Sequence, residues 1–321
     1  MEAKVDMRNK AVSVVLASYN GEKYIEKQLM SIINQTILPG EIIVIDDAST
    51  DNTVKIINDF KSKHAQNIDI NIIVRSHNVG YVTNFIQGID KARGELVFLC
   101  DQDDLWRDNK VEFLLNLFKN NNKIMAIHSN TSIIDKNDNI IKSNTQNYRN
   151  AFEKITLKQY IKKVNYPGMA MAFRKESIFK KIREAIEGGV VPSTHDWLIG
   201  CIASMLDGFY VTKEILTYRR YTGNNVALNI ETSRLSDIDV RIKGVKLYKD
   251  YYLLLEKLQK IYNINIIKAE KYVENADNRI SYLQNKSLFK VIWNITNITY
   301  YPSFKAYMGD LILNLKVIKR G

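Results

Sequence analysis

A run of apolar residues that stops at a cluster of acids constrains the fold of this chain most. Residues Leu96–Cys100 are all apolar, which predicts a strand buried on both faces. Asp101-Gln102-Asp103-Asp104 follows at once, so three carboxylates occupy four positions. Like charges this close make one another harder to ionise. In an open α/β sheet, ligands bind at the carboxyl ends of the strands, so this pattern predicts a binding site there.

Two interpretations of the acid cluster differ in what the carboxylates do. A hard divalent cation that bridges carboxylates to a pyrophosphate would offset their repulsion. Alternatively, the acids belong to a loop that caps the next helix. Asp108 and its neighbours would then lie near the helix start, where negative charge is favourable. Helix capping accounts for one acid well and for three poorly. We therefore favour a cation site.

The chain before this strand alternates between strands and helices. Apolar runs predict three strands, at Ala11–Ala17, Glu41–Ile45 and Ile68–Val74, each followed by residues at helical spacing. This alternation, up to residue 118, predicts a mostly parallel, doubly wound sheet. The second strand also ends in acids, Asp46 and Asp47, which would face the same crevice as the first cluster. The turn at Ser18–Glu22 matches neither the dinucleotide nor the phosphate-loop fingerprint.

Two later segments carry side chains of interest, each with two interpretations. Ser193 or Thr194 can cap a helix and place Asp196 in its first turn, where an acid is common for reasons of the helix dipole alone. Arg219 and Arg220 follow a strand-like stretch and precede a glycine turn. Paired arginines suit phosphate contact, and they equally suit a solvated loop.

The charge of the chain calls for an explanation. Its 321 residues carry a net charge of +11 with a pI near 9.3. Nucleic acid, an anionic membrane and phosphorylated substrates are all compatible with this charge, as is a general richness in lysine. Residues 286–321 mix aromatic and basic residues with one acid, Asp310. That composition suits a membrane interface or, equally, a packed helix whose lysine stems lie along it.

Other features indicate a cytoplasmic protein, peripheral at the inner face of the cell membrane if the basic tail docks there. The first ten residues lack the apolar stretch of a signal peptide, and no run of about twenty apolar residues predicts a membrane span. Cys100 and Cys201 lie in apolar segments, which is typical of buried thiols in a reducing compartment. No cysteine and histidine cluster suggests zinc.

Four motifs resemble family 2 glycosyltransferases of the GT-A fold, in the family's order and spacing. They are Ser13–Gly21, Ile45–Asp51, Asn78–Gly80 and Leu99–Asp104. His195-Asp196-Trp197 and Tyr218-Arg219-Arg220 with Asn224-Asn225 look most like the rhamnosyltransferase branch. The resemblance covers residues 12–225 and departs at Tyr221, where that branch often has a histidine.

The resemblance implies a nucleoside-diphosphate sugar donor, UDP- or dTDP-linked, with Mn²⁺ or Mg²⁺ and inversion at the anomeric carbon. Tyr19 would stack on the pyrimidine, and Asp47 would accept a hydrogen bond from its ring N–H. Asp103 would ligate the metal, and Asp101 would contact the ribose or the metal. Asp196 would be the base that deprotonates the acceptor hydroxyl. The remaining implied donor-binding residues are Ala17, Arg75, Gly80, Arg219 and Arg220.

The implied architecture is a Rossmann-like, mostly parallel central sheet flanked by helices, with a helical C-terminal appendage. We expect a GT-A domain over residues 1–230. Residues 235–284 predict two helices separated near 263–265, and we expect residues 231–321 to form a helical region that contacts a membrane or another copy. The expected reaction adds one rhamnose or hexose to a lipid-linked or polysaccharide acceptor.

Two other functions are compatible with parts of the sequence. A nucleotidyltransferase acting on sugar phosphates also uses carboxylates and a metal, but it would usually have a glycine-rich, basic loop after the first strand. A non-catalytic nucleic-acid-binding protein is suggested only by the net charge, and acids at strand ends argue against it. We therefore expect no nucleic acid partner.

Overall fold

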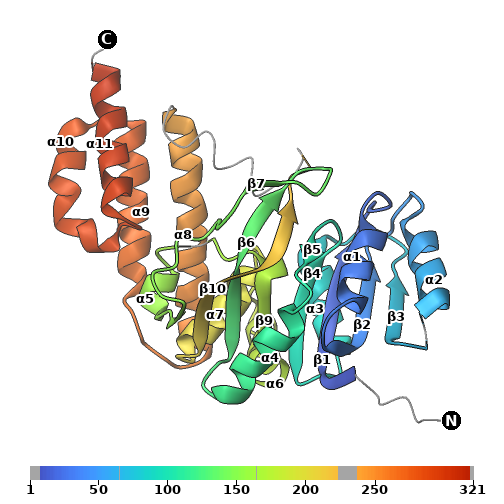
Figure 1. Ribbon diagram of the computed structural model, residues 1–321. Helices are drawn as coiled ribbons and strands as arrows, with labels where there is room; N and C mark the ends of the chain where they lie inside the picture. The colour runs from blue at the N-terminus through green and yellow to red at the C-terminus, as the bar shows by residue number, and fades with distance from the viewer. Residues whose placement is uncertain (1–7, 65, 164, 223–236, 319–321) are drawn as a thin grey trace. The chain divides into compact units, whose positions relative to one another are not determined.

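The computed structural model describes residues 8–64, 66–163, 165–222 and 237–318, which divide into two compact units (Figure 1). The first unit takes in the chain up to Thr156 together with Tyr166–Arg183 and Pro192–Thr222. The second consists of Leu157–Asn165, Glu184–Val191 and the chain from Gly223 onward. The boundary expected at residue 230 lies in 223–236, outside the described residues.

The first unit is built on one mixed sheet whose strands run in the order β3-β2-β1-β4-β9-β6-β10-β5, with β7 and β8 pairing at β6 and β10. The strands are β1 (Arg8–Ser18), β2 (Leu38–Asp46), β3 (Asp69–Val74), β4 (Leu96–Asp101), β5 (Leu105–Trp106), β6 (Ala126–Ile134), β7 (Ile140–Lys142), β8 (Phe152–Lys154), β9 (Met171–Arg174) and β10 (Phe209–Arg220). The first four strands of that order are parallel, and β9 is antiparallel to both its neighbours. The predicted α/β fold with a mostly parallel central sheet is confirmed.

Helices cover both faces of the sheet. Those that lie wholly in this unit are α1 (Ile25–Ile33), α2 (Thr53–His64), α3 (Tyr81–Lys91), α4 (Lys110–Asn120) and α7 (His195–Met205), and α6 (Lys175–Glu187) begins in it. Because side chains alternate along a strand, Val14 and Leu16 of β1 join a core with α1, α2 and α4, whereas Val15 points to the other face. There Gly88 of α3 comes so close that an added Cβ would lie 2.5 Å from the Val15 side chain.

Strand register brings the acid-bearing strand ends together. Ala17 of β1 pairs with Ile45 of β2 on one side and with Asp101 of β4 on the other. The carboxyl ends of three neighbouring strands therefore meet at one edge of the sheet. Before β9 the chain forms a short 3₁₀ turn, η1 (Gly168–Ala170), at the same sheet.

The second unit is helical. It contains α5 (Leu157–Tyr160), α8 (Ile238–Ile261), α9 (Ala269–Gln284), α10 (Leu288–Trp293), the 3₁₀ segment η2 (Asn294–Tyr300) and α11 (Phe304–Ile318). The break between α8 and α9 includes the predicted separation at 263–265. Within the described part of the chain, no helix is long and apolar enough to cross a membrane.

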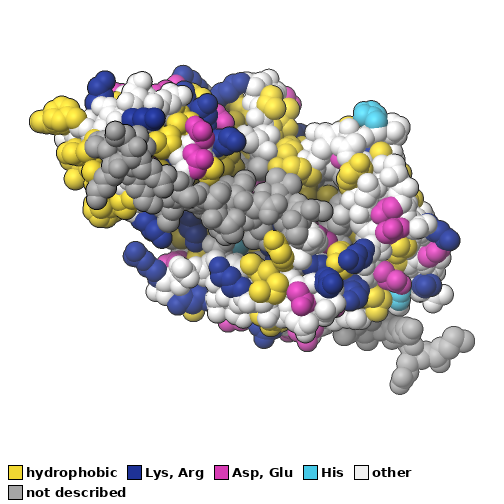
Figure 2. Space-filling view, turned by 90° about the horizontal axis from the view of Figure 1, so that it is seen from above, with side chains coloured by type: hydrophobic (Ala, Val, Ile, Leu, Met, Phe, Trp, Pro, Cys, Tyr) yellow, Lys and Arg dark blue, Asp and Glu magenta, His cyan; other side chains and the backbone are white. Residues whose placement is uncertain are grey.

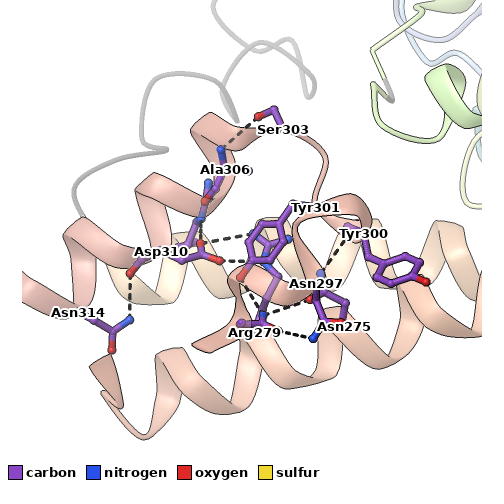
Figure 3. A network of polar contacts seen from close by, with 11 residues as sticks. Asn275, Arg279, Asn297, Tyr300, Tyr301, Ser303, Ala306, Asp310 and Asn314 are labelled. Atoms are coloured by element: carbon purple, nitrogen blue, oxygen red, sulfur yellow. Dashed lines mark hydrogen bonds and ion pairs between the residues drawn. The ribbon is translucent and has the colours of Figure 1, made fainter. Parts of the chain in front are cut away.

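A buried ion-pair network joins three helices of this unit (Figure 3). Asp310 of α11 accepts from Arg241 Nε of α8 at 2.6 Å and from Arg279 Nε of α9 at 2.8 Å. The Arg279 guanidinium also lies over the Tyr301 ring, 4.4 Å from its centroid. One carboxylate thus compensates two cations that are largely removed from water.

Candidate active site

The two acids that end β2 have different surroundings. The carboxylate of Asp46 is buried and accepts from Ser18 Oγ at 2.8 Å and from the Ser49 amide at 2.8 Å, so it holds the turn together. The carboxylate of Asp47 accepts from the amides of Val79 and Gly80, at 2.9 Å each. Asp47 therefore fixes the loop that leads into α3, and each of its oxygens retains a lone pair for a further donor.

Gly80 and Arg75 lie beside Asp47. Gly80 has φ 85°, a left-handed conformation that favours glycine, and it forms the N-cap of α3. The Nε atom of Arg75 is 3.7 Å from Asp47 Oδ1 and donates to Asn84 Oδ1 at 2.7 Å. The structure thus brings together three of the predicted donor-binding residues.

Tyr19 is presented to solvent by a rigid backbone. Its amide donates to Gln102 Oε1 at 2.8 Å, and its carbonyl accepts from Gln102 Nε2 at 2.9 Å, which ties the end of β1 to the end of β4. Its side chain is 46% exposed. Ala17, two residues earlier, lies in β1 between Ile45 and Asp101. The sequence motif contains Gln102, but the pair of hydrogen bonds from its side-chain amide to the Tyr19 backbone, the Gln102 clamp, was not predicted.

In the acid cluster after β4, Asp104 is buried, Asp101 and Asp103 are partly exposed, and the pKa values of all three are raised. Burial, reinforced by the charge of Asp103, raises the pKa of Asp101 to about 7, while Arg219 acts in the opposite direction. Burial also raises the pKa of Asp103 and, with the charges of Asp103 and Asp101, raises that of Asp104 well above its usual value. Asp104 Oδ1 accepts from the Arg220 amide at 2.9 Å, whereas its buried Oδ2 has no partner among the described residues.

The two predicted phosphate-binding arginines point in different directions. Arg219 is partly exposed and lowers the pKa of Asp101 and Asp103, as a nearby cation would. Arg220 is fully buried: its Nε donates to the Asp103 carbonyl at 2.9 Å, and its Nη1 pairs with Asp138 at 2.5 Å. The strand β10 also continues through both arginines instead of ending before them. This placement does not support phosphate contact by Arg220, and its side chain instead fixes the loop that carries the acids.

Asp196 faces the acid cluster from α7. Thr194 is the N-cap of this helix and accepts from the Trp197 amide, as predicted. Asp196 Oδ2 accepts from the Gly168 amide at 3.2 Å. Besides burial, the charge of Asp196 raises the pKa of Tyr81, and Asp101 does the same. Asp196, Asp101 and Tyr81 therefore surround one space.

His195, next to Asp196, is a packing residue. Its ring stacks on Phe85 at 4.0 Å, and burial lowers its pKa, so the ring is neutral near pH 7. Neither ring nitrogen has a hydrogen-bond partner within the described ranges. These features fix the start of α7 against α3.

Lys110 is a buried cation that the sequence interpretation missed. Its ammonium donates to the Met169 carbonyl at 2.8 Å and to Thr217 Oγ1 at 2.9 Å, and lies 3.9 Å from the Trp106 ring centroid. Burial lowers its pKa to about 7, although the charges of Cys100, Asp104 and Asp101 oppose this. One signal was available: Lys110 is the first residue of α4, where the helix dipole disfavours a cation.

Gly168 sets the position of Asp196, which yields a first prediction. A Cβ at residue 168 would lie 2.7 Å from His195 Nε2 and 3.4 Å from Asp196 Cβ. Gly168→Ala should therefore lower the free energy of unfolding by about 1–3 kcal/mol through overpacking, as measured by chemical denaturation. Gly244→Ala is the matched control, because nothing lies within 4 Å of an added Cβ there. Equal stabilities of the two variants would contradict this packing.

The acid cluster offers two carboxylates to a cation, Asp101 and Asp103. Within the described ranges, no group of three or more His, Cys, Asp or Glu side chains is arranged to hold a metal ion. Mg²⁺ commonly binds through one or two carboxylates and completes its shell with substrate phosphates and water. Asp101 and Asp103, partly exposed, close in sequence and with raised pKa values, fit such a two-carboxylate site.

The comparisons with known proteins agree with this fold. An uncharacterized glycosyltransferase of Nostoc sp. is 27% identical over 221 residues, covering 67% of this chain and 66% of that protein. A dTDP-rhamnosyl transferase, RfbG, of Shigella flexneri is 29% identical over 226 residues, covering 67% of this chain and 74% of that protein. The solved structure of S. aureus TarS 1-349 in complex with UDP-GlcNAc superposes with a TM-score of 0.58 at 16% identity, over 97% of this chain and 92% of that one.

The family model extends over the part of the chain that carries the strand-end acids. Residues 13–180, more than half of the 321, match the model described as glycosyl transferase family 2. This range includes the second half of β1 and all of β2, β4 and the acid cluster. The chain belongs to glycosyl transferase family 2.

Proposed function

We propose that this protein is an inverting glycosyltransferase that moves one sugar from a nucleoside-diphosphate sugar to a glycan or lipid-linked acceptor. One observation carries the proposal: two partly buried carboxylates, Asp101 and Asp103, lie at a strand end, and the charge of Asp196, from a separate helix, raises the pKa of Asp101. Inverting transfer needs a positive charge to hold the departing diphosphate and, opposite it, a carboxylate to take the acceptor's proton. We assign this work to residues 1–230.

The nucleotide would bind over the ends of β1 and β2. The exposed ring of Tyr19 offers a face for the base, and Asp47 offers a carboxylate oxygen for its ring N–H. Arg75 and Gly80 lie next to Asp47 and would line one side of this binding site. Ala17, which pairs with Asp101 of β4, would lie beneath the nucleotide. The Gln102 clamp fixes the backbone of Tyr19, which reduces the entropy lost on binding.

The diphosphate would lie near the acid cluster. Asp103 and Asp101 would hold Mn²⁺ or Mg²⁺, and this ion would supply positive charge to the leaving diphosphate. Arg219 adds a second positive charge beside the same acids, since it lowers the pKa of both. Arg220 acts indirectly by holding the carbonyl of Asp103.

Asp196 would take the proton from the acceptor hydroxyl. The Gly168 and Trp197 amides donate to its two oxygens, at 3.2 and 2.7 Å, and so fix the orientation of the carboxylate. Attack by the hydroxyl oxygen on the anomeric carbon forms the new glycosidic bond, and the bond to the diphosphate breaks on the opposite side. That geometry inverts the anomeric centre.

The donor sugar is proposed to be rhamnose or a hexose. The similarity to RfbG, named a dTDP-rhamnosyl transferase, supports a dTDP-linked deoxyhexose, and a UDP-linked hexose is the alternative. A lipid-linked acceptor would require the enzyme to work at the inner face of the cell membrane.

A product assay tests this function. Purified protein incubated with UDP-, dTDP- and GDP-sugars and Mn²⁺ or Mg²⁺ should release the nucleoside diphosphate, and chelation of the metal should stop the release. Asp103→Asn should slow it by about 10²-fold, because the ion loses a charged ligand. Asp108→Asn, at an exposed acid between β5 and α4, is the matched control and should have no effect.

Two results would contradict the proposal. Release of pyrophosphate, in place of the nucleoside diphosphate, would indicate a nucleotidyltransferase. Full metal-dependent activity of Asp103→Asn would show that the cation site is assigned to the wrong residue.

A further inference from the structure

The helix α11 buries Tyr307 and Leu313, but it also buries two polar side chains and exposes several apolar ones. Its polar residues Asp310 and Asn314 are 1% and 0% exposed, and they bond within the unit (Figure 3). Its apolar residues Phe304, Ile312 and Leu315 face outward, and Phe304 is 62% exposed. Water would favour the opposite arrangement, since exposed apolar area carries a free-energy cost.

The preceding segment, α10 and the start of η2, also buries a polar side chain and exposes apolar ones. Asn294 is buried and bonds to Asn275 at 3.1 Å, whereas Trp293 beside it is 61% exposed. In α10, Val291 packs inward while Phe289, Ile292 and Trp293, spaced three and four residues apart, share the outward face. The α10 helix contacts α11 through the hydrogen bond from Tyr307 Oη to the Ile292 carbonyl, at 3.3 Å.

These outward apolar side chains define what we call the α10–α11 surface. It consists of Phe289, Ile292, Trp293, Ile295, Phe304, Ile312 and Leu315, all exposed. Figure 2 shows hydrophobic side chains at the left-hand end, where α10 and α11 lie. Scattered exposed apolar residues are ordinary, but a group on adjoining helices with polar residues beneath it indicates a non-aqueous partner.

The charged side chains exposed within residues 285–315 have one sign. Lys286, Lys290 and Lys305 are exposed beside it. Between residues 285 and 315 the only acid is Asp310, which is buried and paired with Arg241 and Arg279. Residues 285–315 therefore present aromatic and aliphatic side chains with lysines and contribute no exposed carboxylate.

We propose that the α10–α11 surface docks on a lipid bilayer that contains anionic phospholipids. Aromatic and aliphatic side chains enter the headgroup region, and the lysines meet the negative headgroups. A second copy of the chain fits less well, because it would bring lysines against lysines with no exposed acid between them. The proposal deepens the proposed function, since a lipid-linked acceptor is presented at a membrane, but docking itself needs no catalysis.

Vesicle flotation tests the proposal. The full chain should float with vesicles of phosphatidylglycerol and phosphatidylcholine, and much less with phosphatidylcholine alone. Replacement of Phe289, Trp293 and Phe304 together by serine should weaken binding by about tenfold or more, because the inserted area is lost. The matched control is Leu253→Ser with Ile266→Ser, two exposed apolar residues of the same unit outside the surface. The control should float as the wild type does.

Charge reversal gives an independent test. Lys290→Glu with Lys305→Glu should weaken binding to the anionic vesicles by about tenfold, whereas Lys61→Glu with Lys63→Glu, on α2, should not. Salt should weaken wild-type binding in the same direction. Equal flotation of all variants would overturn the proposal. The proposal would also be overturned if the wild type did not float but formed an oligomer in solution, and the triple serine variant did not form this oligomer.

Docking and catalysis can be separated. The triple serine variant should release nucleoside diphosphate at the wild-type rate in the absence of vesicles. If the wild type floats with vesicles but releases no nucleoside diphosphate, the proposed reaction is overturned and docking is supported. If it releases nucleoside diphosphate but does not float, docking is overturned and the proposed reaction is supported.

Discussion

Replacement of Asp196 by asparagine is expected to reduce sugar transfer by about 10²- to 10⁴-fold. The amide has nearly the same shape as the carboxylate, and its single oxygen can still accept one of the two backbone amides that hold Asp196. It cannot, however, take up the acceptor's proton. The loss should therefore appear in the transfer rate, with donor binding little changed.

Helix capping is the competing explanation for Asp196, and a matched variant separates the two roles. Thr194 supplies the N-cap of α7 through its bond to the Trp197 amide. Thr194→Ala should lower stability by about 1 kcal/mol and leave most of the activity. If both variants lost activity in parallel with stability, or if Asp196→Asn stayed within about tenfold of wild type, Asp196 would not be the base.

The sheet could be predicted because its signals are local. The apolar runs at Ala11–Ala17, Glu41–Ile45 and Leu96–Cys100 all became buried strands. Parallel register then placed their carboxyl ends side by side. No further information was needed to bring Asp47 and Asp101 to one edge of the sheet.

The parts that could not be predicted depend on contacts between residues distant in sequence. Arg220 is buried because Tyr24 provides a ring 4.5 Å from its guanidinium and Asp138 provides a carboxylate, neither of which is near it in sequence. Lys110 is buried because Met169 and Thr217 supply its acceptors. Sequence periodicity identifies the buried face of a helix, but it cannot show that a particular cation will find acceptors there.

The same limit applies to the C-terminal unit, where the sequence left open whether the basic, aromatic tail packs or faces a membrane. The structure shows that the one acid of this tail, Asp310, is buried in the network that joins α8, α9 and α11. Since Asp310 links α11 to α8 and α9, we expect the orientation of α11, and with it the exposure of Phe304 and Leu315, to depend on that network.

Asp310→Asn is therefore expected to destabilise the helical unit by about 3–5 kcal/mol, because it leaves Arg241 and Arg279 buried without a counter-charge. Hydrogen exchange followed by mass spectrometry should detect this locally, as protection in α9 and α11 reduced by about 10²- to 10⁴-fold. Asp277→Asn is the matched control: its pair with Lys249 is at the surface, so the change should cost less than about 1 kcal/mol. Equal protection in the two variants would show that the Asp310 network does not hold the unit together. Because α11 owes its outward apolar face to this network, Asp310→Asn should also weaken vesicle binding, although Asp310 itself cannot touch lipid.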